Sequence, residues 1–177
     1  GEMFAMNYLD TTPDIVCLAK SITAGYLPLA VTIFKENIHQ EFVDLNQDKT
    51  FLHGHSFSAN PIACSAAIKS LEIFEKEKTL ENVKKIEQIH NDGLSFLSKN
   101  ALVSKTRYLG GIAAFDIIGF DKGYGAKVGE KIKNNFLEKG YLIRPLGETL
   151  YLMPPFCISE DILKKVYVDI DKELYKI

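Results

Sequence analysis

The 177-residue sequence predicts an α/β protein with two domains. Short apolar runs bounded by Pro and Gly turn signals indicate buried strands. Apolar residues at helical spacing indicate amphipathic helices elsewhere. The chain is strand-rich up to residue 60, continues with two helices, and ends in a β-α-β-β-α order. We therefore expect one domain over residues 1–78 and another over residues 79–177, with the boundary at a long helix of residues 79–99.

The composition excludes several functional classes. A net charge of −2 with interspersed signs gives no basic surface for nucleic acid and no polybasic membrane patch. No stretch approaches the roughly 18 apolar residues of a membrane span, and we recognise no signal peptide. The three cysteines, Cys17, Cys64 and Cys157, are odd in number and lie in apolar surroundings. We expect reduced core thiols in a soluble, cytoplasmic protein.

The segment from Pro13 to Phe34 organises the first domain. Residues 15–18 predict a fully buried strand and residues 28–34 a second one. Lys20 follows the first strand, so its amine would lie at the mouth of a sheet. Burial disfavours the ammonium form, and an uncharged amine there would be a nucleophile suited to Schiff-base chemistry on a carbonyl. A solvated loop lysine is the alternative that the residues themselves leave open.

The following elements have recognisable boundaries. Residues 37–46 have the spacing of a short helix, and a loop rich in His, Gly and Ser follows. Asn60 and Pro61 are typical of a helix start, and this helix should end near Lys76. The amphipathic helix of residues 79–99 comes next.

After this helix, a strand of the second domain is predicted at residues 109–119, with paired glycines at its entry. Residues 127–139 predict a helix that ends at Gly140. Two short strands are expected at residues 141–144 and 150–153, joined by a Pro-Gly turn. Ser159 is the expected cap of a last helix.

The stretch PDIVCLAKSITAGYLPLA resembles the lysine segment of the class III (omega) aminotransferases, which are pyridoxal-phosphate enzymes of fold type I. The resemblance implies that Lys20 carries pyridoxal 5'-phosphate as a Schiff base and moves the proton between substrate and cofactor. It also implies that residues 1–78 are the C-terminal part of the large cofactor-binding domain. Residues 79–177 would then be the C-terminal α+β small domain.

A second motif, HGHSFSANPIACSAA, spans residues 53–67. A Gly beside a hydroxyl can bind phosphate through an amide and an O–H donor, although Gly and Ser before a helix are ordinarily loop and cap residues. The motif resembles a class III signature, which implies that His55 and Ser56 contact the cofactor phosphate of the neighbouring subunit. Gly54 would lie at the substrate. His53 and His55 have no third ligand at a metal-site spacing, so we expect no metal.

A third motif, IRPLGETLYLMPPFCIS, spans residues 143–159. Arg144 precedes Pro145, which restricts its backbone, and its guanidinium suits bidentate recognition of a carboxylate. An ion pair with Glu148 is the alternative. The segment is similar to a class III subgroup acting on a long keto acid, which implies that Arg144 binds the substrate carboxylate. Tyr151 matches a Tyr near the same site.

The resemblance covers nearly the whole chain but only about the second half of the family's length. The chain opens at Gly1 with a segment that lies in the middle of the family's sequences, so we expect the C-terminal part of a longer enzyme. The resemblance also implies that this enzyme is a homodimer that acts on a small keto acid and an amino donor. Other cofactor contacts would lie upstream, and the isolated chain should not transaminate. An ornithine, acetylornithine or 4-aminobutyrate aminotransferase, or a non-catalytic fragment, are the alternatives.

Overall fold

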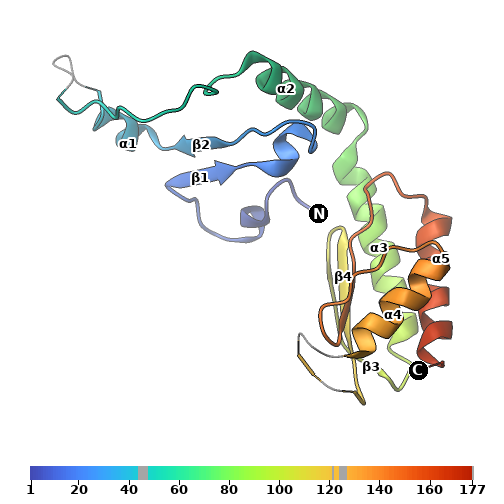
Figure 1. Ribbon diagram of the computed structural model, residues 1–177. Helices are drawn as coiled ribbons and strands as arrows, with labels where there is room; N and C mark the ends of the chain where they lie inside the picture. The colour runs from blue at the N-terminus through green and yellow to red at the C-terminus, as the bar shows by residue number, and fades with distance from the viewer. Residues whose placement is uncertain (44–47, 121, 124–126, 177) are drawn as a thin grey trace. The chain divides into compact units, whose positions relative to one another are not determined.

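The computed structural model describes residues 1–43, 48–120, 122–123 and 127–176 and divides the chain into two compact units (Figure 1). One unit is Phe4–Lys78. The other consists of Gly1–Met3 and Thr79–Ile177. Apart from the first three residues, this division falls at the expected position between residues 78 and 79. The assignment of the two units to a large and a small domain of an enzyme stays a prediction.

The first unit contains a two-stranded antiparallel sheet, one long helix and three short helices. Its elements are η1 (Ala5–Tyr8), β1 (Ile15–Leu18), η2 (Lys20–Thr23), β2 (Val31–Phe34), α1 (Glu36–Gln40) and α2 (Pro61–Lys76). The register pairs Leu18 with Val31. The second strand begins three residues later than predicted, at Val31. The predicted helix of residues 37–46 ends at Gln40, and its residues 44–46 lie outside the described residues.

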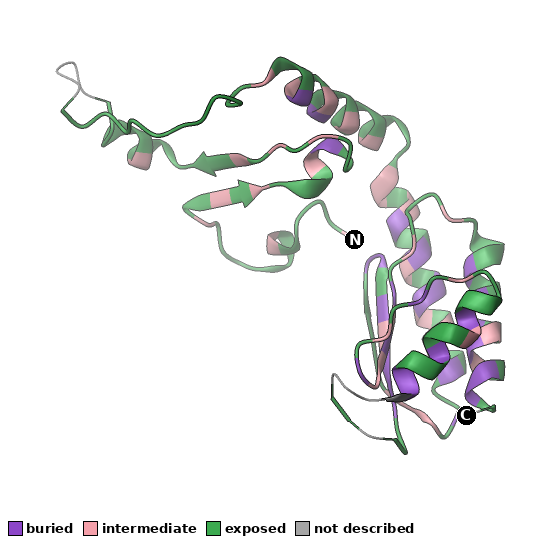
Figure 2. Cartoon of the chain, in the orientation of Figure 1, coloured by how far each residue is buried: buried purple, intermediate pink, exposed green. Residues whose placement is uncertain are grey.

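Burial in this unit is lower than the sequence predicts. Strand β1, expected to be fully buried, has only exposed and half-buried residues (Figure 2). Cys17 and Cys157 are exposed and Cys64 is half-buried, so the expectation of three core thiols is wrong, although all three are free of disulfides. The reason is physical: a sheet of two strands leaves its apolar side chains open unless further layers cover it.

Helix α2 begins as predicted. The Asn60 side chain accepts hydrogen bonds from the N–H groups of Ile62 and Ala63, at 3.0 and 3.2 Å. Its two buried residues are Ala63 and Ala67, and the helix contacts η2. Small side chains permit this close approach, so α2 supports the turn that carries Lys20.

The second unit contains three helices and a three-stranded antiparallel sheet in the order β3-β4-β5. Its elements are α3 (Thr79–Leu97), β3 (Val103–Leu109), β4 (Ile112–Ile117), α4 (Lys127–Glu138), β5 (Thr149–Leu152) and α5 (Glu160–Leu174). The predicted helices are all present. Among the described residues, no helix is long and apolar enough to cross a membrane.

Strand β3 was not predicted, because its sequence VSKTRYL is polar and its ladder is interrupted by a bulge between Ser104 and Arg107. The bulge contains Lys105 at φ +48°. Lys105 and Arg107 both bind the Asp116 carboxylate on β4, at 3.1 and 3.2 Å. Thr149 on β5 donates a hydrogen bond to the same carboxylate at 2.8 Å. The charged side chains of Lys105 and Arg107 are therefore paired across the sheet.

Residues 141–144 were predicted as a strand, and this prediction is wrong. Residues 141–144 are all described and form no bridge. The nearest bridge joins Leu146 to Thr149, the first residue of β5. Ile143 is buried in the core all the same. The apolar alternation that suggested a strand thus reflects side-chain burial without a backbone ladder.

The core of the second unit lies between one face of the sheet and the three helices (Figure 2). Strands β4 and β5 alternate, so that Phe115 and Leu150 face the helices while Asp116 and Thr149 occupy the opposite face. Residues from every helix and from β4 and β5 contribute to the core: Ile86, Ile89, Leu94, Leu97, Ala113, Phe115, Ile117, Val128, Ile132, Phe136, Ile143, Leu150, Leu152, Leu163, Val166, Tyr167, Ile170 and Leu174.

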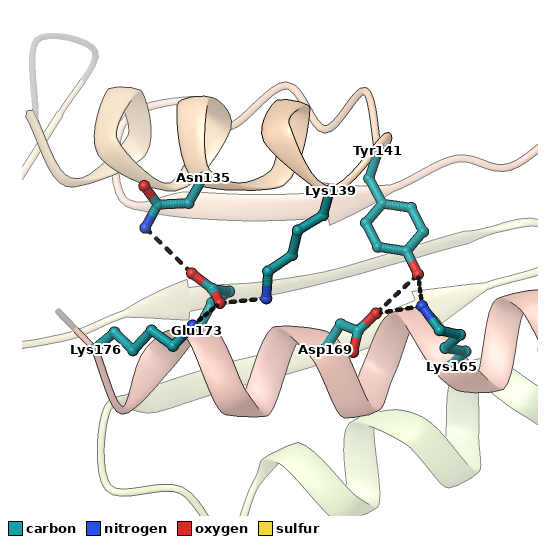
Figure 3. Close-up of polar contacts among 7 residues, drawn as sticks. All are labelled: Asn135, Lys139, Tyr141, Lys165, Asp169, Glu173 and Lys176. Atoms are coloured by element: carbon teal, nitrogen blue, oxygen red, sulfur yellow. Dashed lines mark hydrogen bonds and ion pairs between the residues drawn. The ribbon is translucent and has the colours of Figure 1, made fainter.

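A buried carboxylate joins α4 to α5 (Figure 3). Glu173 is 3% exposed and accepts hydrogen bonds from Lys139, from Asn135 at 3.2 Å and from Lys176 at 2.7 Å. The bonds from Lys139 and Lys176 hold the pKa of the Glu173 carboxyl below its ordinary 4.5, against the effect of burial. The folded state therefore binds this proton less tightly than the unfolded state does, and it is stabilised by the ionised form.

We expect Glu173→Gln to lower the free energy of unfolding of the chain by about 2 kcal/mol near neutral pH, because a charge-assisted network is lost. The difference from the unchanged chain should persist above about pH 4.5 and shrink as the pH falls through the lowered pKa. Urea denaturation followed by circular dichroism measures it. Glu160→Gln, in an exposed pair with Lys164, is the matched control and should cost less than about 0.5 kcal/mol. A pH-independent difference would contradict the assignment.

Candidate functional site

Lys20 lies two residues beyond the end of β1 and begins η2. Ala19 is extended, and Lys20 then takes φ +56°, a left-handed conformation that is uncommon for a residue with a long side chain. Contrary to the prediction of a buried amine, the residue is exposed. The reason is that, among the described residues, this sheet has two strands and no third strand covers its end. Such backbone strain is a recurrent property of functional positions.

The turn after Lys20 is held by Thr23, which the sequence analysis did not single out. Thr23 is 1% exposed. Its hydroxyl donates to the Leu27 carbonyl at 2.5 Å, and the Leu27 N–H donates to the Thr23 hydroxyl oxygen at 3.4 Å. Ala24 and Gly25 follow with φ +52° and +81°. A hydroxyl three residues after the lysine, amid small residues, was the available signal, but the spacing could not show that it is buried.

Lys20 and His55 line the same hollow, whose volume is about 1430 Å³. The wall is formed by the turn after Lys20 and by the segment before α2. The lining residues are Lys20, Ser21, Ala24, Gly25, Tyr26, Leu27, Pro28, Leu29, Ala30, His55, Phe57, Ser58, Ala59, Asn60, Ile62 and Ala63. Gly54 and Ser56 do not line this hollow. Of the three residues predicted from the second motif, His55 is therefore the one that lines it together with Lys20 in the described chain.

The His55 ring has a defined orientation. Its Nδ1 accepts a hydrogen bond from the Phe57 N–H at 3.1 Å. A neutral ring then carries its proton on Nε2, which is left as a donor. The His55 N–H donates to the Ser58 hydroxyl at 3.2 Å, so the segment forms a tight turn. The Ser56 hydroxyl makes no hydrogen bond to a described residue and is exposed.

No metal site accompanies these imidazoles in the described part of the chain. Groups of three or more His, Cys, Asp or Glu in metal-binding proximity do not occur among the described residues. The ring of His53 instead lies beside Phe51, with centroids 5.5 Å apart.

Arg144 and Tyr151 belong to the second unit. The ion pair between Arg144 and Glu148, which was the alternative to a substrate-binding role, does not form. Glu148 accepts from the Gly123 N–H at 2.7 Å, and backbone hydrogen bonds, from its own amide and from Gly123, lower the pKa of its carboxyl. Arg144 is exposed and pairs with no acidic side chain in the described ranges. Tyr151 is half-buried on β5, on the face away from the core.

The sequence model of the family described as Aminotransferase class-III matches residues 1–174. Similar curated proteins include the adenosylmethionine-8-amino-7-oxononanoate aminotransferase of Synechococcus elongatus, 39% identical over 96% of this chain and 40% of that protein. The enzyme of the same name from Helicobacter pylori is 37% identical over 99% of this chain and 42% of that protein. The chain spans about 40% of the length of these curated relatives.

Solved structures show the same similarity. The crystal structure of adenosylmethionine-8-amino-7-oxononanoate aminotransferase from Methanocaldococcus jannaschii aligns with a TM-score of 0.82 and 32% identity, over 93% of this chain and 39% of that one. An acetylornithine aminotransferase from Elizabethkingia anophelis aligns with a TM-score of 0.82 and 26% identity, over 99% of this chain and 42% of that one. The chain therefore has the α/β fold of the corresponding part of these aminotransferases.

Thr23→Val should destabilise the turn that carries Lys20, because it removes a buried hydroxyl while keeping the side chain's shape. We expect a loss of about 1–2 kcal/mol in the local opening free energy. Amide hydrogen exchange at Leu27, followed by NMR, measures it directly. Thr12→Val, at an exposed position, is the control. Equal exchange rates at Leu27 in both variants would show that the Thr23 hydroxyl does not hold the turn.

Proposed function

Since this chain belongs to the class III aminotransferase family, we propose that the enzyme containing it transfers an amino group to the ketone of 8-amino-7-oxononanoate. The product would be 7,8-diaminononanoate, in biotin synthesis, with adenosylmethionine as the amino donor. The names of the relatives that are 37–39% identical support this substrate pair. The motif around Arg144, which resembles the same enzymes, also supports it. The observation that carries the proposal is the Lys20 amine, which lines a hollow of about 1430 Å³.

The residues around the hollow fit pyridoxal 5'-phosphate, an aromatic aldehyde that bears a phosphate. The hollow has room for such a group and presents a primary amine on one wall. Lys20 would hold the aldehyde through Nζ. When bound, the cofactor supplies an electron-accepting ring that stabilises negative charge on the substrate's reacting carbon. Lys20 Nζ would move the proton at that carbon, as a positioned amine does in general acid–base catalysis.

We propose that Ser56 and His55 bind the phosphate of the neighbouring subunit in a homodimer, with Gly54 at the substrate. The Ser56 hydroxyl is exposed, makes no hydrogen bond to a described residue, and does not line the hollow of its own chain. A donor so placed is available to a group outside its own chain. His55 would contribute its Nε2–H. A cytoplasmic location fits three cysteines without disulfides.

The substrate carboxylate is proposed to bind Arg144, with Tyr151 beside it. An exposed guanidinium without an acidic partner among the described residues is available for a bidentate contact. Because the chain spans about 40% of the length of its relatives, we propose that the remaining part of the enzyme completes the site.

The chain by itself should then not transaminate. A cofactor titration of the 177-residue chain, followed by visible absorbance, examines this point: stoichiometric tight binding would favour a self-sufficient site.

In the full-length enzyme, Lys20→Ala should abolish both transamination and the visible absorption band of the lysine-bound cofactor, because no other amine would hold the aldehyde. Lys69→Ala, on the exposed surface of α2, is the matched control and should leave both unchanged. Absorbance spectra and product formation are measured on the same preparations. Retained turnover in Lys20→Ala would refute the role of this lysine.

Arg144→Ala should raise the KM for 8-amino-7-oxononanoate about 100-fold, because the carboxylate loses a bidentate charge-assisted contact. Assays of the unchanged full-length enzyme with the ketone or aldehyde substrates of the ornithine, acetylornithine and 4-aminobutyrate types test the alternatives in parallel. The 26% identical acetylornithine enzyme makes that substrate the first competitor to examine. Faster turnover of any of these than of the oxononanoate would overturn the proposed substrate.

A further inference from the structure

We infer that Gly129 on α4 is a positioning residue for Arg144, acting through the packing of the Pro145–Gly147 backbone. This inference rests on the proposed carboxylate-binding role of Arg144. It concerns how the fold orients that guanidinium, because Arg144 lies in a loop outside the described strands. All the residues involved lie in the second unit.

The segment that carries Arg144 lacks a strand's ladder and is held by separate contacts on both sides. Upstream, the side chain of Ile143 is buried in the core, 6% exposed. Downstream, Leu146 and Thr149 exchange backbone hydrogen bonds of 2.8 and 3.0 Å. The Glu148 carbonyl accepts from the Ile117 N–H at 2.9 Å. Arg144 therefore projects from a short loop whose two ends are fixed.

The middle of this loop rests on the first turn of α4. Gly129 is buried, and a Cβ added there would lie 2.5 Å from the Gly147 carbonyl oxygen and 3.1 Å from Pro145 Cβ. The nearer atom is backbone, so it cannot rotate away as a side-chain terminus could. Gly147 itself has φ +62°, a left-handed conformation that glycine adopts at little cost. Hence any side chain at residue 129 must push Pro145 and Gly147 outward.

A displacement of Pro145 is transmitted to Arg144, because the peptide bond joins them and proline restricts the backbone of the residue before it. The guanidinium would move relative to the substrate carboxylate. Bidentate contacts depend on both distance and orientation, so a shift of about 1 Å is enough to weaken them substantially. The expected result is weaker keto-acid binding, with the chemistry at Lys20 unaffected.

The test uses the full-length holoenzyme with Gly129→Ala, Arg144→Ala and the double variant. The substrates are 8-amino-7-oxononanoate and its methyl ester, which lacks the carboxylate charge. Gly129→Ala should raise the KM for the acid about tenfold and change kcat by less than about twofold. Its effect on the ester should be small. In the double variant, Gly129→Ala should add nothing to the effect of Arg144→Ala.

Gly140→Ala is the matched control. Gly140 follows α4 at φ +81°, so alanine is strained there, but a Cβ would meet nothing within 4 Å. This variant should lower Tm without changing the acid-to-ester preference. If Gly129→Ala does not fold, Pro145→Gly tests the same contact from the loop side and should raise the KM for the acid about fivefold, because it frees the Arg144 backbone.

The outcomes separate this inference from the proposed function. An unchanged KM for the acid in Gly129→Ala, or in Pro145→Gly if that variant is needed, overturns the inference when Arg144→Ala still raises it. An unchanged KM in Arg144→Ala removes the carboxylate role and the inference together. Equal effects of Gly129→Ala on acid and ester would show general damage and would also overturn it.

Discussion

Covering one face of a three-stranded antiparallel sheet with three helices is the constraint on which the second unit depends. The core-facing residues of β4 and β5, such as Phe115 and Leu150, are almost inaccessible to water and meet residues of α3, α4 and α5. The polar side chains of β4 and β5 then lie on the opposite face of the sheet. The Asp116 network occupies that opposite face, and Glu173 lies between two helices. The loop of Arg144 is fixed because its neighbours are anchored in this core.

The first unit has a different balance. Its sheet has two strands and leaves Ile15, Ile33 and Phe34 largely open, and α2 exposes Ile62 and Ile68. Local hydrogen bonds hold the turns around the hollow, with the Thr23 hydroxyl as the buried example. Such an arrangement gives a defined lysine position on a weakly packed support. It agrees with a chain that spans about 40% of its relatives, because the apolar faces have no cover among its own described residues.

Elements with strong local signals could be predicted from the sequence. The Asn60 cap, the amphipathic helices and the final helix after Ser159 depend on neighbours within a few residues. Strand β3 could not be predicted, because its polar side chains are satisfied by Asp116, which lies on another strand. The exposure of Lys20 and Cys17 also escaped prediction. Burial depends on the layers that pack around a segment, and the sequence of the segment alone does not show which layers these are.

The same limit applies to the residues that support the site. The motifs singled out Lys20 and Arg144, while Thr23 and Gly129 became visible only through contacts with Leu27 and with the 145–147 backbone. The absence of a backbone ladder at residues 141–144 has a consequence for divergence within the family. Because the guanidinium is carried by a loop outside the sheet, a few substitutions there can redirect it and leave the hydrophobic interior intact. Under the carboxylate-binding role proposed for Arg144, related proteins can thus come to accept different acids without a change of fold.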